Sequence, residues 1–146
     1  MIMKRFLMFL VAGLVVLATA CDKEDDVPPT EQLDAATRSV LEGMYPTATI
    51  VDVDNYAEYT EVEILDGTTY RDLYFDKAGA WLRTETDVRL TDVPAAVTAA
   101  VAASPHATLP IDDVDWIESP TGNYYAVELD SNPDVYLKIT AEGVIL

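Results

Sequence analysis

Two stretches of the chain, residues 33–86 and 91–146, carry the same order of features, and this internal repeat constrains the fold more than any other property of the sequence. Each stretch opens with helical periodicity, breaks at a proline and continues in short segments of alternating polarity. Residues 45–49 match residues 104–108, with Pro46 and Pro105 in the same place. Because proline cannot continue a helix and drives the preceding residue toward extended geometry, both helices should end there.

The two helical segments, residues 33–44 and 93–103, each place apolar side chains on one face. In the first segment these are Leu33, Thr37, Val40, Leu41 and Met44, and in the second they are Val93, Val97, Ala100 and Val101. Pro94 suits the first turn of the second helix, and Asp92 or Thr91 is expected to cap it.

Strands are predicted after each helix. In the first stretch they cover residues 49–54, 57–65, 69–75 and 80–86, and in the second 111–117, 123–129, 134–140 and 143–146. Gly79 and Gly143 occupy the same place before the last strand of each stretch, which indicates a hairpin turn with positive φ. Helices followed by runs of strands indicate an α+β fold. The expected architecture is two tandem helix-plus-four-strand antiparallel meander units, with both helices packed on one face of the sheet.

Alternation along the strands sorts their side chains onto two faces. The apolar set expected under the helices is Val62, Ile64, Leu73, Phe75, Tyr125, Val127, Leu129, Val135, Leu137 and Ile139. The opposite face receives Tyr59, Tyr70, Tyr74, Tyr124 and Tyr136, together with Glu61, Glu63, Asp72, Glu128 and Lys138. Tyrosine is common at contact surfaces, so we predict that the five tyrosines bind a partner. Cross-strand pairing that stabilises a half-exposed sheet is the alternative. Serine in place of Tyr74 and Tyr136 is expected to leave folding nearly intact.

The amino terminus has the features of an export signal. Lys4 and Arg5 precede an apolar run over residues 6–18, which is shorter than the roughly 20 residues of a membrane span. Residues 1–20 are therefore predicted to be a signal peptide. Residues 17–21 resemble a lipobox, although the leucine usual at Ala18 stands one place earlier. We expect Cys21 to carry the lipid; as the one cysteine, it excludes an internal disulfide.

The segment after Cys21 is acidic. Residues 21–32 are predicted to form a lipidated acidic linker that leads to a domain over residues 33–146. Residues 22–26 resemble the surface-export signal of Bacteroidota lipoproteins, and they also fit a solvated tether. The expected location is the outer membrane, lipid-anchored and surface-exposed, with a periplasm-facing orientation as the alternative.

Charge narrows the class of partner. The first 20 residues hold two of the nine basic residues and none of the 26 acidic ones, so the remainder has a net charge of −19. Such a chain repels nucleic acid and anionic lipid head groups. The expected contact with the membrane is therefore the lipid anchor on Cys21. The balance favours solubility: a solvated surface on an exported protein is the favoured interpretation, and a basic partner is the alternative.

Catalytic and metal-binding patterns are missing from the sequence. His106 is expected in the turn after the second helix, and none of the serines lies in a nucleophile elbow. The acidic runs 52–55 and 112–115 lack the glycine and terminal glutamate of an EF-hand loop, so they are predicted to be solvated strand residues. We expect no catalytic residue, no metal and no cofactor, and therefore not an enzyme.

The duplicated order, with residues 75–82 closing the first unit, resembles the PepSY-like family of beta-lactamase-inhibitor-like lipoproteins and periplasmic proteins. The resemblance covers residues 33–146 and implies that the strands form one curved sheet. The beta-lactamase inhibitory protein binds its enzyme through a concave sheet face rich in aromatic and acidic residues, which is where the predicted tyrosines would lie. No inhibitor loop matches residue by residue, so inhibition of a beta-lactamase does not carry over.

The expected function is a non-catalytic envelope lipoprotein that binds or inhibits an unidentified protein through its exposed sheet face. A carbohydrate or small-ligand binding accessory lipoprotein is the alternative, with tyrosines stacking on sugars. A structural role in the envelope without a discrete ligand is a third.

Overall fold

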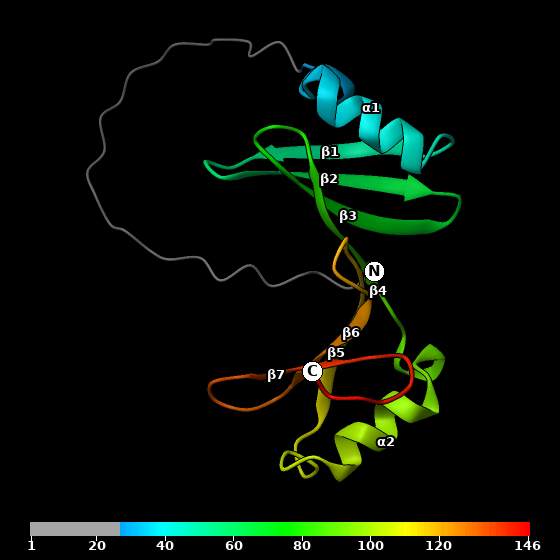
Figure 1. Ribbon diagram of the computed structural model, residues 1–146, viewed down its shortest axis with the longest axis vertical. Coiled ribbons are helices and arrows are strands. Elements are labelled where there is room, and N and C mark those ends of the chain that lie inside the picture. The colour runs from blue at the N-terminus through cyan, green and yellow to red at the C-terminus, as the bar shows by residue number, and fades with distance from the viewer. Residues whose placement is uncertain (1–26) are drawn as a thin grey trace, which may run out of the picture.

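The computed structural model describes residues 27–146, and the predicted signal peptide and Cys21 lie outside them. A short 3-10 helix, Pro29–Glu31, precedes α1 (Ala35–Met44). Four strands follow: β1 (Thr49–Asn55), β2 (Tyr59–Asp66), β3 (Thr69–Asp76) and β4 (Trp81–Asp87). A second 3-10 helix, Leu90–Asp92, leads to α2 (Ala95–Ala103) and then to β5 (Ile111–Glu118), β6 (Tyr124–Leu129) and β7 (Val135–Ile139) (Figure 1).

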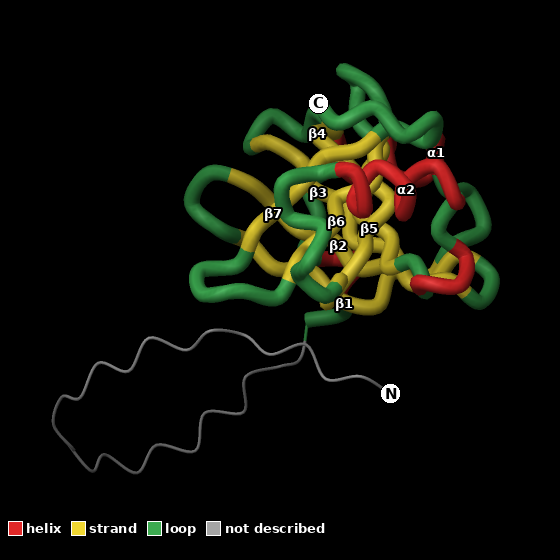
Figure 2. The backbone as a smooth tube through the Cα atoms, turned by 90° about the horizontal axis from the view of Figure 1, so that it is seen from below, coloured by secondary structure: helices red, strands yellow, loops and turns green. Residues whose placement is uncertain are grey.

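The strands form one seven-stranded sheet in sequence order, with every neighbouring pair antiparallel (Figures 1 and 2). β4 and β5 join the two halves of the sheet through pairs that run from Thr84 opposite Glu118 to Asp87 opposite Asp115. The α+β prediction is therefore confirmed. Each strand begins and ends within about two residues of its expected limits, because the alternation of apolar residues marks the paired segments.

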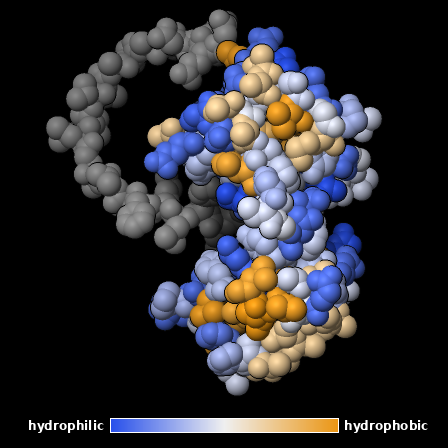
Figure 3. Space-filling view, viewed as in Figure 1, coloured by the Kyte–Doolittle hydropathy of each residue, from blue (hydrophilic) through white to orange (hydrophobic). Residues whose placement is uncertain are grey.

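Each helix covers its own part of the sheet. Side chains from α1 pack with β1, β2 and β3 around Leu41, Val62 and Phe75, while Val97 and Val101 of α2 pack with β5, β6 and β7. Figure 1 shows α1 beside one end of the sheet and α2 beside the other, and the space-filling view narrows between them near β4 (Figure 3). The expected apolar face is confirmed, and it is divided into two separate hydrophobic clusters.

One corresponding turn fixes each helix to its strands. Gly79 and Gly143 have φ angles of 83° and 87°. A Cβ atom on Gly79 would lie 2.8 Å from the Ala36 Cβ atom, and one on Gly143 would lie 2.6 Å from the Ala96 carbonyl oxygen. Both turns therefore need glycine for its backbone conformation and for its lack of a side chain against the helix.

The two helices begin differently. The Asp34 carboxylate caps α1 by accepting the N–H groups of Ala36 at 2.8 Å and Thr37 at 2.9 Å. The expected cap of α2 by Asp92 or Thr91 is wrong, because Pro94 occupies the capping position and no side chain caps that helix. Both residues belong instead to the preceding 3-10 helix.

The two halves of the sheet also differ at their ends. The predicted strand over residues 143–146 is reduced to an isolated bridge between Ile139 and Ile145 and a bond from the Leu146 N–H to the Lys138 carbonyl. The second half therefore has three strands, so the expected pair of four-strand units is not what the structure shows. In the first half β4 is a full strand because it pairs on both sides, with β3 and with β5.

Candidate functional site: the helix-free face of the sheet

We call the sheet surface opposite α1 and α2 the open face. Cross-strand pairing places Glu61, Tyr74 and Arg83 in one row on it, and Glu85, Ile117 and Tyr124 in another. Alternation and register put all the predicted tyrosines on this face: Tyr59, Tyr70, Tyr74, Tyr124 and Tyr136. The sequence-based prediction of which face of the sheet carries these tyrosines is therefore confirmed.

Tyr74 is the centre of the first half of this face. Its side chain is mostly buried, with 9% of the residue exposed. The hydroxyl oxygen lies 3.3 Å from Glu61 Oε1 and 3.2 Å from Glu85 Oε2, and the Arg83 guanidinium carbon lies 3.7 Å from the ring centroid. Arg83 Nε in turn donates to Glu85 Oε1 at 2.6 Å. Tyr74 is therefore held inside a polar network, and a partner would reach it only through its neighbours.

The electrostatics of this network keep each group in a defined charge state. Burial, reinforced by Glu85 and Glu61, raises the pKa of Tyr74 far above its usual range. Burial also raises the pKa of Glu61, with Asp72 adding to the effect. For Arg83, burial alone would lower the pKa, but the hydrogen bond to Glu85 outweighs it and the pKa is raised. Near neutral pH the phenol stays protonated and the guanidinium stays charged.

A second aromatic group extends from Tyr74 toward the β1–β2 hairpin. The Tyr59 and Tyr74 ring centroids lie 5.8 Å apart, and Tyr56 stacks on Tyr59 at 4.6 Å. Tyr56 was not among the predicted site residues, because it lies in the hairpin after β1 where alternation gives no face. Its proximity to Tyr59 across a short turn was the signal that could have identified it; the Tyr56 N–H donates to the Tyr59 carbonyl at 3.0 Å.

The other half of the open face carries the most exposed tyrosine. Tyr136 on β7 is 65% exposed, and its hydrogen bond with Glu128 raises the pKa of the phenol. Tyr124 lies under Lys138, whose Nζ atom is 5.1 Å from the ring centroid. Tyr70 is 57% exposed near the β2–β3 hairpin, away from these two groups. The five predicted tyrosines thus share one face without forming one continuous cluster.

The residues considered for catalysis or metal binding do not form a catalytic or metal site in the described part of the chain. Within residues 27–146, no three His, Cys, Asp or Glu side chains are grouped so that they could hold a metal ion. His106 lies in the turn after α2, as expected, where its N–H donates to Ser104 Oγ. Asp52 and Asp113 each accept the N–H of the following valine at 2.9 Å, next to matching irregularities in β1 and β5. These carboxylates support the strand geometry.

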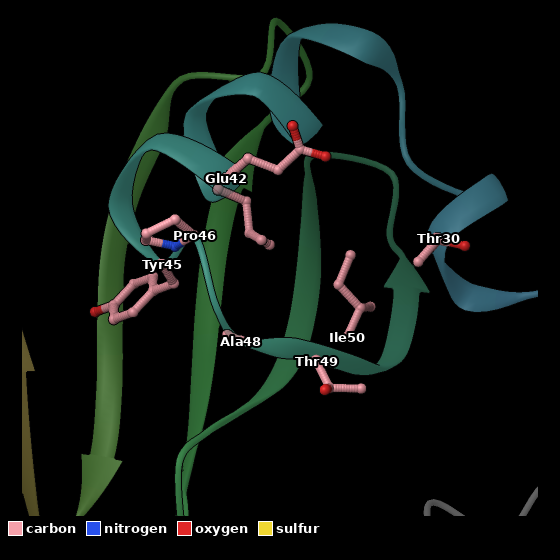
Figure 4. A pocket seen from close by; sticks show the side chains of 8 residues that line it. Thr30, Glu42, Tyr45, Pro46, Ala48, Thr49 and Ile50 are labelled. Carbon is pink, nitrogen blue, oxygen red and sulfur yellow. The ribbon is translucent and has the colours of Figure 1, made fainter.

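An open pocket lies on the other side of the molecule, between the end of α1 and the outer edge of β1 (Figure 4). Tyr45 and Pro46 lie toward one end of it and Thr30 toward the other, with Glu42 above. Among the lining residues that the structure describes, the Glu42 carboxylate is the one charged side chain. Without converging polar groups, this pocket offers little chemistry for recognising a ligand.

Comparisons with known proteins agree with this fold. The family model for beta-lactamase-inhibitor-like, PepSY-like proteins matches residues 58–146. A BLIP-like protein from Bacteroides fragilis is 25% identical, with a TM-score of 0.69 and coverage of 82% of this chain and 84% of that one. A DUF2874 family protein from Bacteroides uniformis is 27% identical, with a TM-score of 0.68 and coverage of 78% and 86%.

A third solved structure, from Bacteroides eggerthii, is described provisionally as periplasmic. It is 24% identical, with a TM-score of 0.65 and coverage of 77% of this chain and 85% of that one, and this likeness bears on the fold alone. A comparison with curated proteins found no match. In the part of the chain that the structure describes, no helix is both long enough and apolar enough to cross a membrane.

Proposed function

This chain belongs to the PepSY-like family of beta-lactamase-inhibitor-like proteins, and from that premise we propose that it is a non-catalytic module that binds a protein through the open face. The observation that carries the proposal is the distribution of side chains on the sheet. Both hydrophobic clusters lie on the helix side, yet the open face still holds the tyrosines. Tyrosine combines a rigid apolar ring with a polar tip, which suits an interface that must be soluble when unoccupied.

The arrangement of the face also supports this role. Tyr74, Arg83 and Glu85 are held together by short contacts on adjacent strands, so the centre of the face is ordered before a partner arrives. Preorganised side chains lose less conformational entropy on binding than mobile ones. Around this centre, Tyr56 and Tyr136 remain exposed for direct contact.

Within the same proposal, Cys21 carries the lipid and residues 21–32 tether the domain to the outer membrane, with the domain facing outward. The apolar run before Cys21 and the acidic residues after it support this placement. Protease added to intact cells should degrade the domain. Protection of the domain in intact cells, with degradation after the outer membrane is opened, would place it on the periplasmic side.

Capture of partners from an envelope extract tests the binding role. The full chain, held in a detergent with neutral head groups, is compared with a Tyr59→Ser/Tyr136→Ser variant and with a control variant, Met44→Ser/Leu90→Ser. The control also removes two exposed large side chains, and both lie outside the open face. We expect the tyrosine variant to lose its captured proteins and the control to keep them. Equal capture by both variants would reject the open face as the contact surface.

A carbohydrate-binding role is the alternative, and the ring contacts favour the protein partner over it. The pairs Arg83–Tyr74 and Lys138–Tyr124 cover ring faces that a sugar would need. Retention of the chain on a polysaccharide column, lost in the Tyr59→Ser/Tyr136→Ser variant, would favour the alternative.

A further inference from the structure

We infer that the protein partner presents lysine or arginine side chains to the open face, and that these side chains are received at two sites near its opposite ends. The inference rests on the proposed function and specifies the chemistry of the partner. Site one, at the β1–β2 hairpin, comprises Tyr56, Tyr59, Asp54 and Glu61. Site two, on β6 and β7, comprises Tyr136, Glu128 and Asp134.

The charge of the open face is the first argument. One cross-strand row consists of four carboxylates on four adjacent strands: Asp52, Glu63, Asp72 and Glu85. Like charges on directly opposed residues destabilise a sheet, so a face with this row of carboxylates suits a partner that brings cations. The cations that the described strands contribute to this face are Arg83 and Lys138.

The second argument is that the fold already holds cations on tyrosine in this way. Arg83 lies 3.7 Å from the Tyr74 ring centroid while its Nε atom donates to Glu85. Lys138 lies over the Tyr124 ring at 5.1 Å. Arg83 on β4 is therefore held by a ring face together with a carboxylate, as expected for a cation–π contact supported by charge.

The two end sites have similar components without such a cation. Across residues 27–146, the cation–π contacts involve Tyr45, Tyr74 and Tyr124, not the tyrosines of either end site. At site one, Asp54 lies directly opposite Glu61, which is two residues from Tyr59 on β2, and Tyr56 stacks on Tyr59. Burial, followed by Asp54 and Glu61, raises the pKa of Tyr56. At site two, Glu128 on β6 lies directly opposite Tyr136 on β7. Burial raises the pKa of Glu128, the hydrogen bond with Tyr136 lowers it in part, and Asp134 and Asp112 add repulsion. A lysine or arginine at either site would reverse this repulsion.

The distance between the sites favours a protein over a small polyamine. Tyr59 lies on β2 and Tyr136 on β7, which are five strands apart in the sheet. At the usual spacing of about 4.8 Å between strands, the sites are separated by roughly 25 Å along the sheet. A small free cation occupies one site at a time, whereas basic residues on a protein surface can occupy both.

Calorimetric titration with a peptide of alternating lysine and serine tests the inference. About ten residues are enough, because an extended chain of that length exceeds 25 Å. The site-one variant is Asp54→Asn/Glu61→Gln and the site-two variant is Glu128→Gln/Asp134→Asn. The charge-matched control is Glu42→Gln/Glu142→Gln, which neutralises two exposed carboxylates outside the open face. A peptide of alternating glutamate and serine serves as the negative probe.

We expect the lysine peptide to bind the full chain and to bind more weakly as salt is added. Each site variant should bind about tenfold more weakly, and the control should stay within about twofold of the original chain. Equal weakening in the site variants and the control would mean that only net charge matters, and the inference would be wrong. Absence of binding by the lysine peptide would reject it as well.

The envelope extract separates this inference from the proposed function. If the Tyr59→Ser/Tyr136→Ser variant loses its captured proteins while both site variants keep them in high salt and in low salt, the open face binds proteins but the cation sites are wrong. If the tyrosine variant also keeps them, the proposed function itself fails.

Discussion

Arg83 lies over the ring of Tyr74, with its guanidinium carbon 3.7 Å from the ring centroid. The same guanidinium donates to Glu85, and the Tyr74 hydroxyl lies between Glu61 and Glu85. This arrangement makes Tyr74 a structural residue of the open face, in contrast to the sequence-based expectation that serine could replace it with little effect on folding.

Replacement of Tyr74 should therefore reduce stability. Tyr74→Ser removes a mostly buried ring and leaves Arg83 and two carboxylates without their shared partner, so we expect a loss of about 2–4 kcal/mol in the free energy of unfolding. The matched variant Tyr136→Ser changes a largely exposed ring and should cost less than about 0.5 kcal/mol. Urea denaturation measures both values, and similar losses would contradict the assignment of Tyr74 to the structural core of the face.

The turns at Gly79 and Gly143 provide a second test. An alanine at either position would place its Cβ atom within 2.8 Å of the neighbouring helix while also requiring a positive φ. We expect each substitution to cost more than about 2 kcal/mol. Gly67→Ala is the control, because Gly67 has a φ of 63° but no atom within 4 Å of the added Cβ. That variant should cost only the backbone strain, about 1 kcal/mol. Equal losses at Gly67 and Gly79 would show that the close approach to α1 has no energetic role.

Gly43 should respond in the opposite direction. It lies within α1, has no positive φ and has open space where a Cβ would be added. Alanine favours the helix over glycine, so Gly43→Ala should raise the free energy of unfolding by about 0.5–1 kcal/mol. A lower thermal midpoint in this variant would contradict the structure, because it would mean that the added methyl group at position 43 meets a neighbouring group.

Glu61 should make the free energy of unfolding depend on pH. Because burial raises its pKa in the folded state above the ordinary value of 4.5, its contribution is most favourable below pH 4.5 and is lost as the pH rises through the folded pKa. Asp34 acts in the opposite sense: its hydrogen bonds to Thr37 lower its pKa, so its contribution is lost as the pH falls below 3.8.

The Glu61→Gln variant isolates the first effect. The amide keeps an acceptor for the Tyr74 hydroxyl but has no charge to desolvate, so the variant should lose less stability than the original chain as the pH rises above 4.5. Chemical denaturation at several pH values measures the difference. Parallel curves for the two proteins would mean that Glu61 has the same pKa in the folded and unfolded states.

The faces and the strand limits could be predicted because they follow from local alternation. Val62 and Ile64 on β2, and Val127 and Leu129 on β6, lie two positions apart, and the structure buries all four on the helix side. The burial of Tyr74 could not be predicted in this way, because it depends on Arg83 and Glu85 from the next strand and therefore on register. Ile117 shows the same limit: it pairs with Glu85 and Tyr124 on the open face yet is buried.

The remaining differences have similar causes. Asp92 has the chemistry of a helix cap, but the capping position of α2 is taken by Pro94 and Asp92 lies in a 3-10 turn. Tyr56 lies in a hairpin, where side-chain direction depends on the turn, and its stacking on Tyr59 becomes evident only in three dimensions. The candidate site was thus identified at the level of a face, while its internal organisation required the structure.

Photo-crosslinking tests the central claim, that the open face is the partner contact, most directly. A photoreactive phenylalanine analogue is placed at Tyr136 on the open face in one protein and at Leu90 in the other, since both side chains are exposed and Leu90 lies in the 3-10 helix before α2. After irradiation in the envelope, we predict a discrete protein adduct from position 136 and none from position 90. An adduct from position 90 alone, or the same adduct in equal yield from both positions, would contradict the claim.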